Sequence, residues 1–559
     1  MIFCTINDFP AYGNLSGYKV KGAKACPICL EDTCSHWMKE TKKTVYLGNR
    51  RFLSRYHPYR RKSVEFNGKV ENGAAPRELT GMEIYGKVQG KSVDFGKGKK
   101  GKGKREKGKK GKGKEDEEIW KKKSIFWDLP YWRNLDVRHC LDGMHIIKNI
   151  AESLFGILLN IKGKTKDGIN VRRDLVEMGI RPELAPEVRD GGRIFLPAAC
   201  YTLRKEEKLS LLECLKSIKV PTGYSANISS RVSLKEMKLI GMKSHDWHVL
   251  LTQLLPVAIR GILPPRVRHS ITKLCFFFNS ICAKTVYAES LVQLQKDVAV
   301  TLCELEMFLP PSFFDIMVHL TIHLVREIRL CGPMFLRYMY PFERAMGQLK
   351  AMVRSRSKPE GSIITGTRDE EVIEYYTDYL EGVQPIGLPK SRHEGRLVGV
   401  GIKGSKFITP GYQLREKAHL KVLEHMTEVS DYVNDHLDEL RKQNPLRGEG
   451  WIHNEHGRTF SNWFALKVEK LISESSTITE TVKWLSRGPG ARVQTWQGFA
   501  MNGYTWYTKQ QDDKSTVQNS GVSLVALSGT DSTLDSYYGW IEEIWELDYT
   551  RFSIPLFFC

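Results

Sequence analysis

Apolar residues recur every three to four positions through most of residues 230–350, with polar residues between them. This spacing is typical of helices that bury one face. Two proline pairs, Pro264-Pro265 and Pro310-Pro311, interrupt the pattern and mark helix boundaries. We therefore expect four helices in this region, over Trp247–Leu255, Val267–Lys284, Leu291–Leu309 and Phe313–Leu330.

The patterns elsewhere in the chain predict a mixture of elements. The short apolar run of residues 1–7 predicts a strand, which Asp8 closes. Ile146–Leu159 and Leu414–Lys442 have the spacing of further helices. From about residue 485, Thr, Val, Tyr and Trp are interspersed with glycine turns, which predicts a small β-rich C-terminal domain.

A Gly- and Lys-rich stretch over residues 95–118 divides the chain. Such a sequence has too few apolar residues to bury a core, so we expect a disordered linker. The predicted organisation has five segments: a first segment with the strand and a CxxC motif (1–90), the linker (91–125), a largely helical segment (126–360), a linker with further helix (361–480), and the β-rich domain (481–559).

The composition favours a globular protein with a polyanionic partner. The chain has 559 residues, of which 41% are hydrophobic, and a net charge of +21. That charge favours binding to nucleic acid, although an acidic membrane surface also fits it. No apolar run is long enough to span a bilayer. The 12 cysteines are scattered apart from one CxxC, which suits metal binding in the reducing cytosol or nucleus.

A segment near the N-terminus alternates aromatic and basic side chains. It contains five candidate DNA contacts: Arg50, Arg51, Arg60, Arg61 and Lys62. Basic and aromatic side chains together are typical of nucleic-acid surfaces, because they pair with phosphates and stack on bases. A solvated loop with locally packed aromatics is the other interpretation, and the sequence leaves both open.

Two pairs of residues have spacings that suit zinc, which prefers four Cys and His ligands in a tetrahedron. Cys26 and Cys29 form the CxxC, and His319 and His323 lie four apart in a helical pattern, so both rings share one face. A local alternative is a knuckle in which Cys34 and His36 complete the site with the CxxC. Spacing alone does not rank the long-range site above the local one.

Two acids are placed where catalytic metal ions could be held. Asp8 ends the first strand, and Glu343 begins a predicted helix after Pro341. Two-metal phosphodiester chemistry needs carboxylates that hold two Mg²⁺ or Mn²⁺ ions. The structural alternatives are a turn cap for Asp8 and a helix N-terminal charge for Glu343. A third cluster, Asp136, Asp142 and His145, is interpreted mainly as a helix cap or buried polar group.

Long stretches of this chain resemble the TNP2-like transposases of plant CACTA (En/Spm-type) DNA transposons. The resemblance covers most of the chain apart from the Gly/Lys tract. The matching stretches are Thr5–Gly17, Ala25–Cys29, Tyr131–His145, Leu254–Arg260, Met339–Gly347 and, in the tail, Asn502–Gly503–Tyr504, Gln518–Val522 and Tyr537–Gly539.

This resemblance implies a fold, a chemistry and partners. The implied fold class is α/β plus α: an RNase H-like (DDE) core interrupted by a large helical insertion, followed by the β-rich domain. Asp8 then matches the second catalytic acid and Glu343 the third, with Mg²⁺ as cofactor. Cys26, Cys29, His319 and His323 match a structural zinc site, which raises the long-range site above the local knuckle. The implied partners are DNA and further transposase subunits, in the nucleus.

One departure from the family pattern changes the expected activity. No residue matches the first catalytic Asp, which the resemblance places upstream of Met1. A site with two of three carboxylates binds Mg²⁺ poorly. We therefore expect a transposase-derived fragment that is inactive alone. The alternatives are a DNA- or protein-binding remnant and a zinc-stabilised interaction protein with no DNA role.

Overall fold

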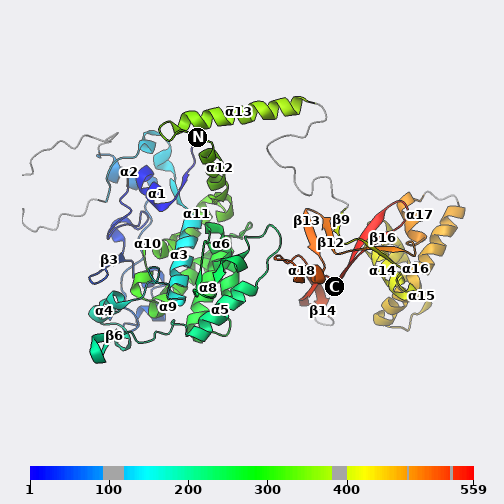
Figure 1. The fold of residues 1–559 in the computed structure, drawn as a ribbon, viewed down its shortest axis with the longest axis horizontal. Coiled ribbons are helices and arrows are strands. Elements are labelled where there is room, and N and C mark those ends of the chain that lie inside the picture. Colours follow the sequence, from blue (N-terminus) through cyan, green and yellow to red (C-terminus); the bar gives the residue numbers. More distant parts are fainter. Residues whose placement is uncertain (92–118, 381–398, 475–477, 529–532) are drawn as a thin grey trace, which may run out of the picture. The chain divides into compact units, whose positions relative to one another are not determined.

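The computed structural model describes residues 1–91, 119–380, 399–474, 478–528 and 533–559. These residues divide into two compact units (Figure 1). Unit 1 comprises Met1–Ile218 and Ile228–Asp369, and unit 2 comprises Lys219–Asn227 and Glu370–Cys559. The linker predicted over the Gly/Lys tract falls almost entirely outside the described residues.

Unit 1 is mainly helical and has only short strands. Its strands are β1 Thr5–Asn7, β2 His36–Met38, β3 Lys43–Val45, β4 His139–Leu141, β5 Glu187–Arg189, β6 Arg193–Phe195, β7 Val232–Ser233 and β8 Lys238–Leu239. Its helices are α1 Phe9–Ser16, α2 Gly81–Val88, α3 Gly143–Leu158, α4 Ile169–Met178, α5 Lys205–Ser217, α6 Ser244–Val249, α7 Leu255–Ala258, α8 Pro265–Ile281, α9 Ser290–Phe308, α10 Ile316–Leu320, α11 Leu324–Cys331 and α12 Tyr340–Ala351. A further helix, α13 Pro359–Tyr379, spans the boundary between the units.

A parallel pair of strands organises the start of unit 1. β1 lies beside β4, with Thr5 opposite His139 and Asn7 opposite Leu141. Helix α1 follows β1 after Asp8, and helix α3 follows β4 after Asp142. The carboxyl ends of parallel strands meet at one edge, so these two acids lie at the same edge of the pair.

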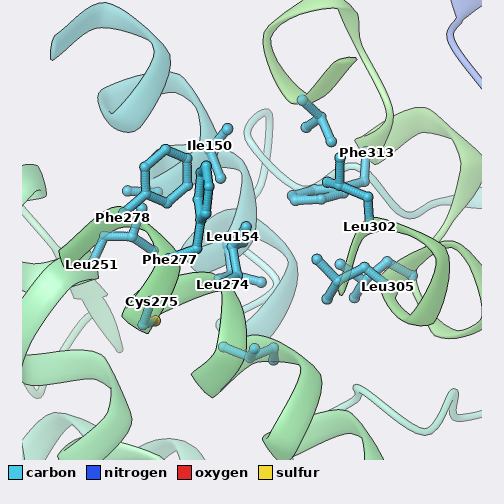
Figure 2. Close-up of a cluster of buried hydrophobic side chains, with 14 of the residues drawn as sticks. Ile150, Leu154, Leu251, Leu274, Cys275, Phe277, Phe278, Leu302, Leu305 and Phe313 are labelled. Carbon is cyan, nitrogen blue, oxygen red and sulfur yellow. The ribbon is translucent and has the colours of Figure 1, made fainter. Parts of the chain in front are cut away.

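Helix α3 forms the centre of the unit 1 core. Twelve of its 16 residues are buried. The other four, His145, Lys148, Asn149 and Glu152, are half-buried and share one polar face, so the rest of the helix surface packs into the core. Figure 2 shows Ile150 and Leu154 of α3 beside Phe277 and Phe278 of α8, with residues of α9 across the same core.

The same core includes the N-terminal segment. Phe9, Cys26 and Leu53 belong to the apolar cluster that α3, α8 and α9 build. The predicted segments 1–90 and 126–360 therefore fold as one unit, because neither buries its apolar residues alone. The last residues of the predicted linker also pack: Trp120 is buried and pairs with Tyr18.

The predicted helices of residues 230–350 are present, with two changes in backbone geometry. The helix expected over Phe313–Leu330 is divided into α10 and α11 by a tighter 3₁₀ turn over Thr321–His323. The helix expected over Trp247–Leu255 contains a π-helical turn, Leu250–Leu254. Asp315 caps α10 by accepting hydrogen bonds from the amides of Met317 and Val318.

Unit 2 combines helices and antiparallel strands. Its strands are β9 Val400–Lys403, β10 Lys406–Ile408, β11 Val493–Trp496, β12 Gly498–Met501, β13 Tyr504–Tyr507, β14 Gly521–Ser528, β15 Thr533–Trp540, β16 Glu543–Asp548 and β17 Ser553–Phe558. Its helices are α14 Tyr412–His425, α15 Ser430–Gln443, α16 Glu449–Ser473, α17 Glu480–Ser486 and α18 Lys509–Asp513.

The β-rich tail has a small apolar cluster of its own, around Phe499, Ile541 and Ile544, but its larger core is shared with the preceding helices. Val493 and Trp545, from the sheet ordered β10-β11-β16-β17, share a buried cluster with Val422 of α14 and Phe460 of α16. The segments expected at 361–480 and 481–559 thus stabilise each other. The single helix expected over Leu414–Lys442 is two helices, α14 and α15, separated by a 3₁₀ turn.

None of the helices in the described part of the chain is long and apolar enough to cross a membrane.

Candidate functional site

Four metal-ligand side chains from distant parts of unit 1 meet in its interior. Cys26 and Cys29 come from the loop after α1, His319 from α10 and His323 from the 3₁₀ turn that follows it. All four are buried, and their ligand atoms lie within 4.8 Å of one another. We call this set the Cys₂His₂ group.

The distances in this group fit a tetrahedral zinc site. The Sγ of Cys29 lies 3.4 Å from Nε2 of His319 and 3.3 Å from Nε2 of His323. The two Nε2 atoms are 3.4 Å apart. Zinc bonded to sulfur and nitrogen at its usual lengths in a tetrahedron separates S and N by about 3.6 Å and two N atoms by about 3.3 Å. The donor set and its geometry therefore fit Zn²⁺.

The surroundings of the group favour the thiolate form of Cys26 and the neutral thiol form of Cys29, whose pKa is raised by its contact with Cys26 and by burial. The amide of Cys29 donates to the Sγ of Cys26 at 3.3 Å, as in zinc knuckles. Burial opposes ionisation, but the Cys29 thiol and the two imidazoles lower the pKa of Cys26 well below its usual range. The ring of Phe52 packs against that of His323, with the ring centroids 5.9 Å apart.

The local alternative ligands lie apart from this group. Within the described residues, Cys34 and His36 belong to no set of three or more close ligand atoms. His36 is exposed on β2, and the side chain of Cys34 packs against Gly48, where an added Cβ would lie 2.8 Å from Sγ. The structure thus gathers the long-range quartet predicted by the resemblance, not the knuckle.

Two acids lie together at the carboxyl edge of β1 and β4. The amide of Asp142 donates to the carbonyl of Asn7 at 2.9 Å, which continues the strand pairing by one residue. Each acid also caps the helix that follows: Asp8 accepts from the amide of Ala11 at 2.7 Å, and Asp142 from that of Met144 at 2.9 Å. The helix cap expected for Asp142 is confirmed, and Asp8, for which a turn cap was the structural alternative, caps a helix that was not predicted.

His145 brings the third acid into the same group. Its Nδ1–H donates to Oδ2 of Asp142, which raises the pKa of the imidazole. The carboxylates of Glu343 and Asp8 raise that pKa further, so both lie within electrostatic range of the ring. We call Asp8, Asp142, His145 and Glu343 the acid group. Asp8 and His145 are half-buried and Glu343 is exposed, so solvent reaches the group.

Asp142 and His145 were interpreted mainly as a helix cap or buried polar group, and their position beside Asp8 is an addition from the structure. The available signal was an acid shortly before the predicted helix Ile146–Leu159, with a histidine three residues later. Pairing of β4 with β1 was needed to place this acid beside Asp8, and residues 139–141 are too few for periodicity to predict a strand.

A buried ion pair connects this edge to α11, the helix that follows the two histidines of the Cys₂His₂ group. Glu327 of α11 accepts hydrogen bonds from the amide of Leu141 at 3.1 Å and from Nη1 of Arg337 at 3.1 Å. Burial raises the pKa of Glu327 to about 7, although Arg337 opposes the increase. Strand β4 is therefore fixed to α11 just before Asp142.

Two of the five predicted DNA contacts have a structural role instead. Arg50 is buried: its guanidinium donates to Oδ1 of Asn67 at 2.9 Å and to the carbonyl of Lys69 at 3.0 Å, and stacks over Phe66. Arg60 is also buried, and its guanidinium donates to four backbone carbonyls. The DNA-contact prediction is wrong for these two residues, because both guanidiniums are buried and hydrogen-bonded inside the loop.

The other three basic residues keep some exposure to solvent. Arg61 is exposed, whereas Arg51 and Lys62 are half-buried. Arg51 lies 3.5 Å from Glu71, and Lys62 lies 2.7 Å from Glu65. Surface ion pairs of this kind contribute little and exchange readily for a phosphate.

Comparison with known sequence families supports assignment to a transposase family. Residues 1–91 match the family described as Transposase family tnp2. Residues 281–393 match the family described as Domain of unknown function (DUF4218). No curated protein and no solved structure matches the chain.

Each matched segment contributes residues to both the Cys₂His₂ group and the acid group. The first contains Asp8, Cys26 and Cys29, and the second contains His319, His323 and Glu343. Asp142 and His145 lie in neither. The tertiary structure thus brings the two matched segments together at the Cys₂His₂ group and again near the acid group.

Proposed function

We propose that this chain is a transposon-derived transposase of the CACTA (En/Spm) type from a plant, with a DDE-type acid site for metal-dependent DNA strand transfer. The observation that carries the proposal is the placement of Asp8 and Asp142 at the carboxyl edge of the paired strands β1 and β4, where Asp142 is hydrogen-bonded to His145 and Glu343 lies within electrostatic range of that ring. The match of residues 1–91 to the tnp2 transposase family supports it.

The arrangement of these acids is consistent with an RNase H-like core, which is part of the proposal. Asp8 and Asp142 follow adjacent parallel strands, and Glu343 comes from the fourth residue of a helix. Parallel strands ending in carboxylates can present oxygen ligands to a divalent cation from one edge. Mg²⁺ prefers such oxygen ligands and retains several waters.

Asp8 and Glu343 would hold Mg²⁺ or Mn²⁺, and Asp142 stands beside them. Bound divalent ions activate an attacking water or 3′-hydroxyl and stabilise the leaving oxygen. The protein's own contribution is position. The caps fix Asp8 and Asp142 on helix N-termini, and the Asp142–His145 contact holds a proton on Nδ1.

The DNA partner follows from charge and from the family match. The chain carries a net charge of +21, which favours a polyanion. Arg61 and Lys62 provide an accessible basic surface in the tnp2-matched segment. Action in the nucleus and assembly as a homo-oligomer or with another transposase subunit are further parts of this proposal.

The Cys₂His₂ group would hold one structural Zn²⁺. Its four ligands satisfy the tetrahedral preference of zinc, which leaves no position open for catalysis. Its role is to join the loop that follows Asp8's helix to the helices that lead toward Glu343.

Mn²⁺ binding tests the proposed acid site directly, with the bound ion measured by electron paramagnetic resonance. Asp8→Asn and Glu343→Gln should each weaken Mn²⁺ binding at least about tenfold, because a carboxylate ligand is lost. Glu213→Gln, which removes an exposed acid from α5, is the matched control and should bind as wild type does. Equal affinity in all four proteins overturns the assignment.

A second candidate function is a non-catalytic DNA- or protein-binding remnant stabilised by zinc. One observation favours it: α12, the helix that carries Glu343, has no buried residue and exposes the side chains of Phe342 and Met346. This alternative predicts DNA or protein binding that Asp8→Asn and Glu343→Gln leave unchanged, with no Mn²⁺ bound at the acid group.

A further inference from the structure

A second group of sulfur ligands lies at the other end of α11 from the Cys₂His₂ group. Cys4 directly precedes β1, Cys140 is the central residue of β4, and Cys331 is the last residue of α11. The three Sγ atoms lie within 4.8 Å of one another. We call Cys4, Cys140 and Cys331 the three-cysteine group.

The sulfur separation in this group fits shared metal binding. The Sγ atoms of Cys140 and Cys331 are 3.8 Å apart. Thiolates bonded to one tetrahedral zinc at the usual length are about 3.8 Å apart. A disulfide would need sulfurs about 2.05 Å apart, so these thiols are placed as neighbouring ligands and not as a bonded pair.

The charges around the group act in both directions. The guanidinium of Arg337 lies within electrostatic range of all three cysteines and favours their thiolates, whereas its partner Glu327 raises the pKa of Cys4 and Cys140. Arg337 is buried, and its Nε has no hydrogen-bond partner in the described part of the chain. A buried cation with an unused donor stabilises negative charge close to it. Such charge appears when three thiols bind a cation and release their protons.

We propose that the three-cysteine group is a second metal site, which binds one thiophilic d¹⁰ cation, Zn²⁺ or Cu(I), through three thiolates. Soft thiolate ligands select these ions from the divalent and monovalent metals of the cell. Cys140 is buried, whereas Cys4 and Cys331 are half-buried, so water can reach a fourth position on the ion.

The position of the site suggests its structural effect. Helix α11 begins directly after His323 and ends at Cys331. One metal ion would fix its start to the CxxC loop, and the second would fix its end to β1 and β4. The strands that present Asp8 and Asp142 would then be held to the segment that continues to Glu343. The inference does not depend on the proposed catalytic function.

Metal content of the full chain tests the inference. Protein purified under a thiol-free reductant is loaded separately with Zn²⁺ and with Cu(I), and bound metal is counted by mass spectrometry after passage over a chelating resin. Cys331→Ser and Cys4→Ser should each bind one ion fewer than wild type after loading with whichever of the two metals, Zn²⁺ or Cu(I), the site accepts. Cys214→Ser removes a half-buried cysteine from α5 and should bind as many ions as wild type.

The result is independent of the Cys₂His₂ group, because the readout is a difference of one ion between variants. Thermal unfolding identifies a variant that fails to fold. Cys4→Ser, at a half-buried position before the first strand, keeps the test decisive if Cys331→Ser does not fold. Equal metal content in wild type, Cys4→Ser and Cys331→Ser in both arms overturns the inference, and so does a Cys140–Cys331 disulfide in protein purified without reductant.

Discussion

The amide of Asp142 donates a hydrogen bond to the carbonyl of Asn7, and this contact aligns Asp142 with Asp8 at one edge of the parallel pair β1 and β4. The two acids are separated by more than 130 residues in the sequence. Both cap a helix, and both affect the protonation of His145. Two strands of only three residues each therefore end in one shared polar edge.

Removal of ligands from the Cys₂His₂ group should release one zinc ion and destabilise the protein. His319→Ala with His323→Ala should lose the ion and on the order of 5 kcal/mol of unfolding free energy or more, since apparent zinc-binding free energies in small zinc domains are about 10–16 kcal/mol. Metal analysis and thermal unfolding measure the two effects.

Cys34→Ala with His36→Ala provides the matched control for that experiment. These residues lie outside the Cys₂His₂ group, so zinc content should equal that of wild type. Loss of zinc in this variant, with retention in the double histidine variant, would mean that the metal occupies a local knuckle instead.

The buried Glu327 should make stability depend on pH. Burial raises its pKa to about 7 from an ordinary value of 4.5, so the folded protein binds more protons than the unfolded chain between these two values. Stability from this group should therefore decrease as pH rises from about 4.5 to 7, by on the order of 3 kcal/mol.

Glu327→Gln isolates this effect because the amide does not titrate. The difference in unfolding free energy between wild type and Glu327→Gln, measured at pH 5, 6 and 7, should shift against wild type as pH rises. A constant difference across that interval would contradict the assignment of the raised pKa to Glu327.

Substitution of Arg50 should reduce stability, whereas substitution of Arg61 should reduce DNA binding. Arg50→Ala removes buried donors from backbone carbonyls and should cost about 2–4 kcal/mol of stability. Arg61→Ala should change stability by less than about 0.5 kcal/mol. In titrations of duplex DNA by fluorescence anisotropy, Arg61→Ala should weaken binding and reduce the salt slope by about 1.

Gly143→Ala should destabilise the start of α3. An added Cβ would lie 2.2 Å from Sδ of Met334, which is buried and has little room to move. We expect a cost of about 1–3 kcal/mol, as for other overpacked cores. Gly86→Ala in α2 is the control, because nothing lies within 4 Å of its added Cβ. It should be neutral or stabilising by up to about 1 kcal/mol.

Local sequence was sufficient for the helices and for several functional candidates. The periodic apolar residues of α8 and α9 predicted those helices within a few residues, because one buried face imposes a 3.6-residue repeat. The capping role of Asp142 also followed from local sequence, since a cap needs only its own first helical turn. The Cys₂His₂ quartet followed only with the help of family resemblance.

Other features depended on contacts between residues distant in the sequence. The three-residue strand β4 carries no periodic signal, yet its pairing with β1 places Asp142 beside Asp8. The burial of Arg50 and Arg60 depends on a loop that folds back so that its own carbonyls accept from both guanidiniums. Basic sequence composition does not distinguish such arginines from exposed ones.

The sequence by itself determined the helical content of residues 230–350, the basic charge of the chain, and the residue types able to bind zinc. Only the tertiary structure decided which of these residues meet. Cys26 and His323 are 297 positions apart, and local spacing cannot relate residues so distant in the sequence. Cys4, Cys140 and Cys331 share no sequence motif. The physical reason is that periodicity and capping act within a few residues, whereas a ligand set is assembled by the burial of apolar faces from the whole unit.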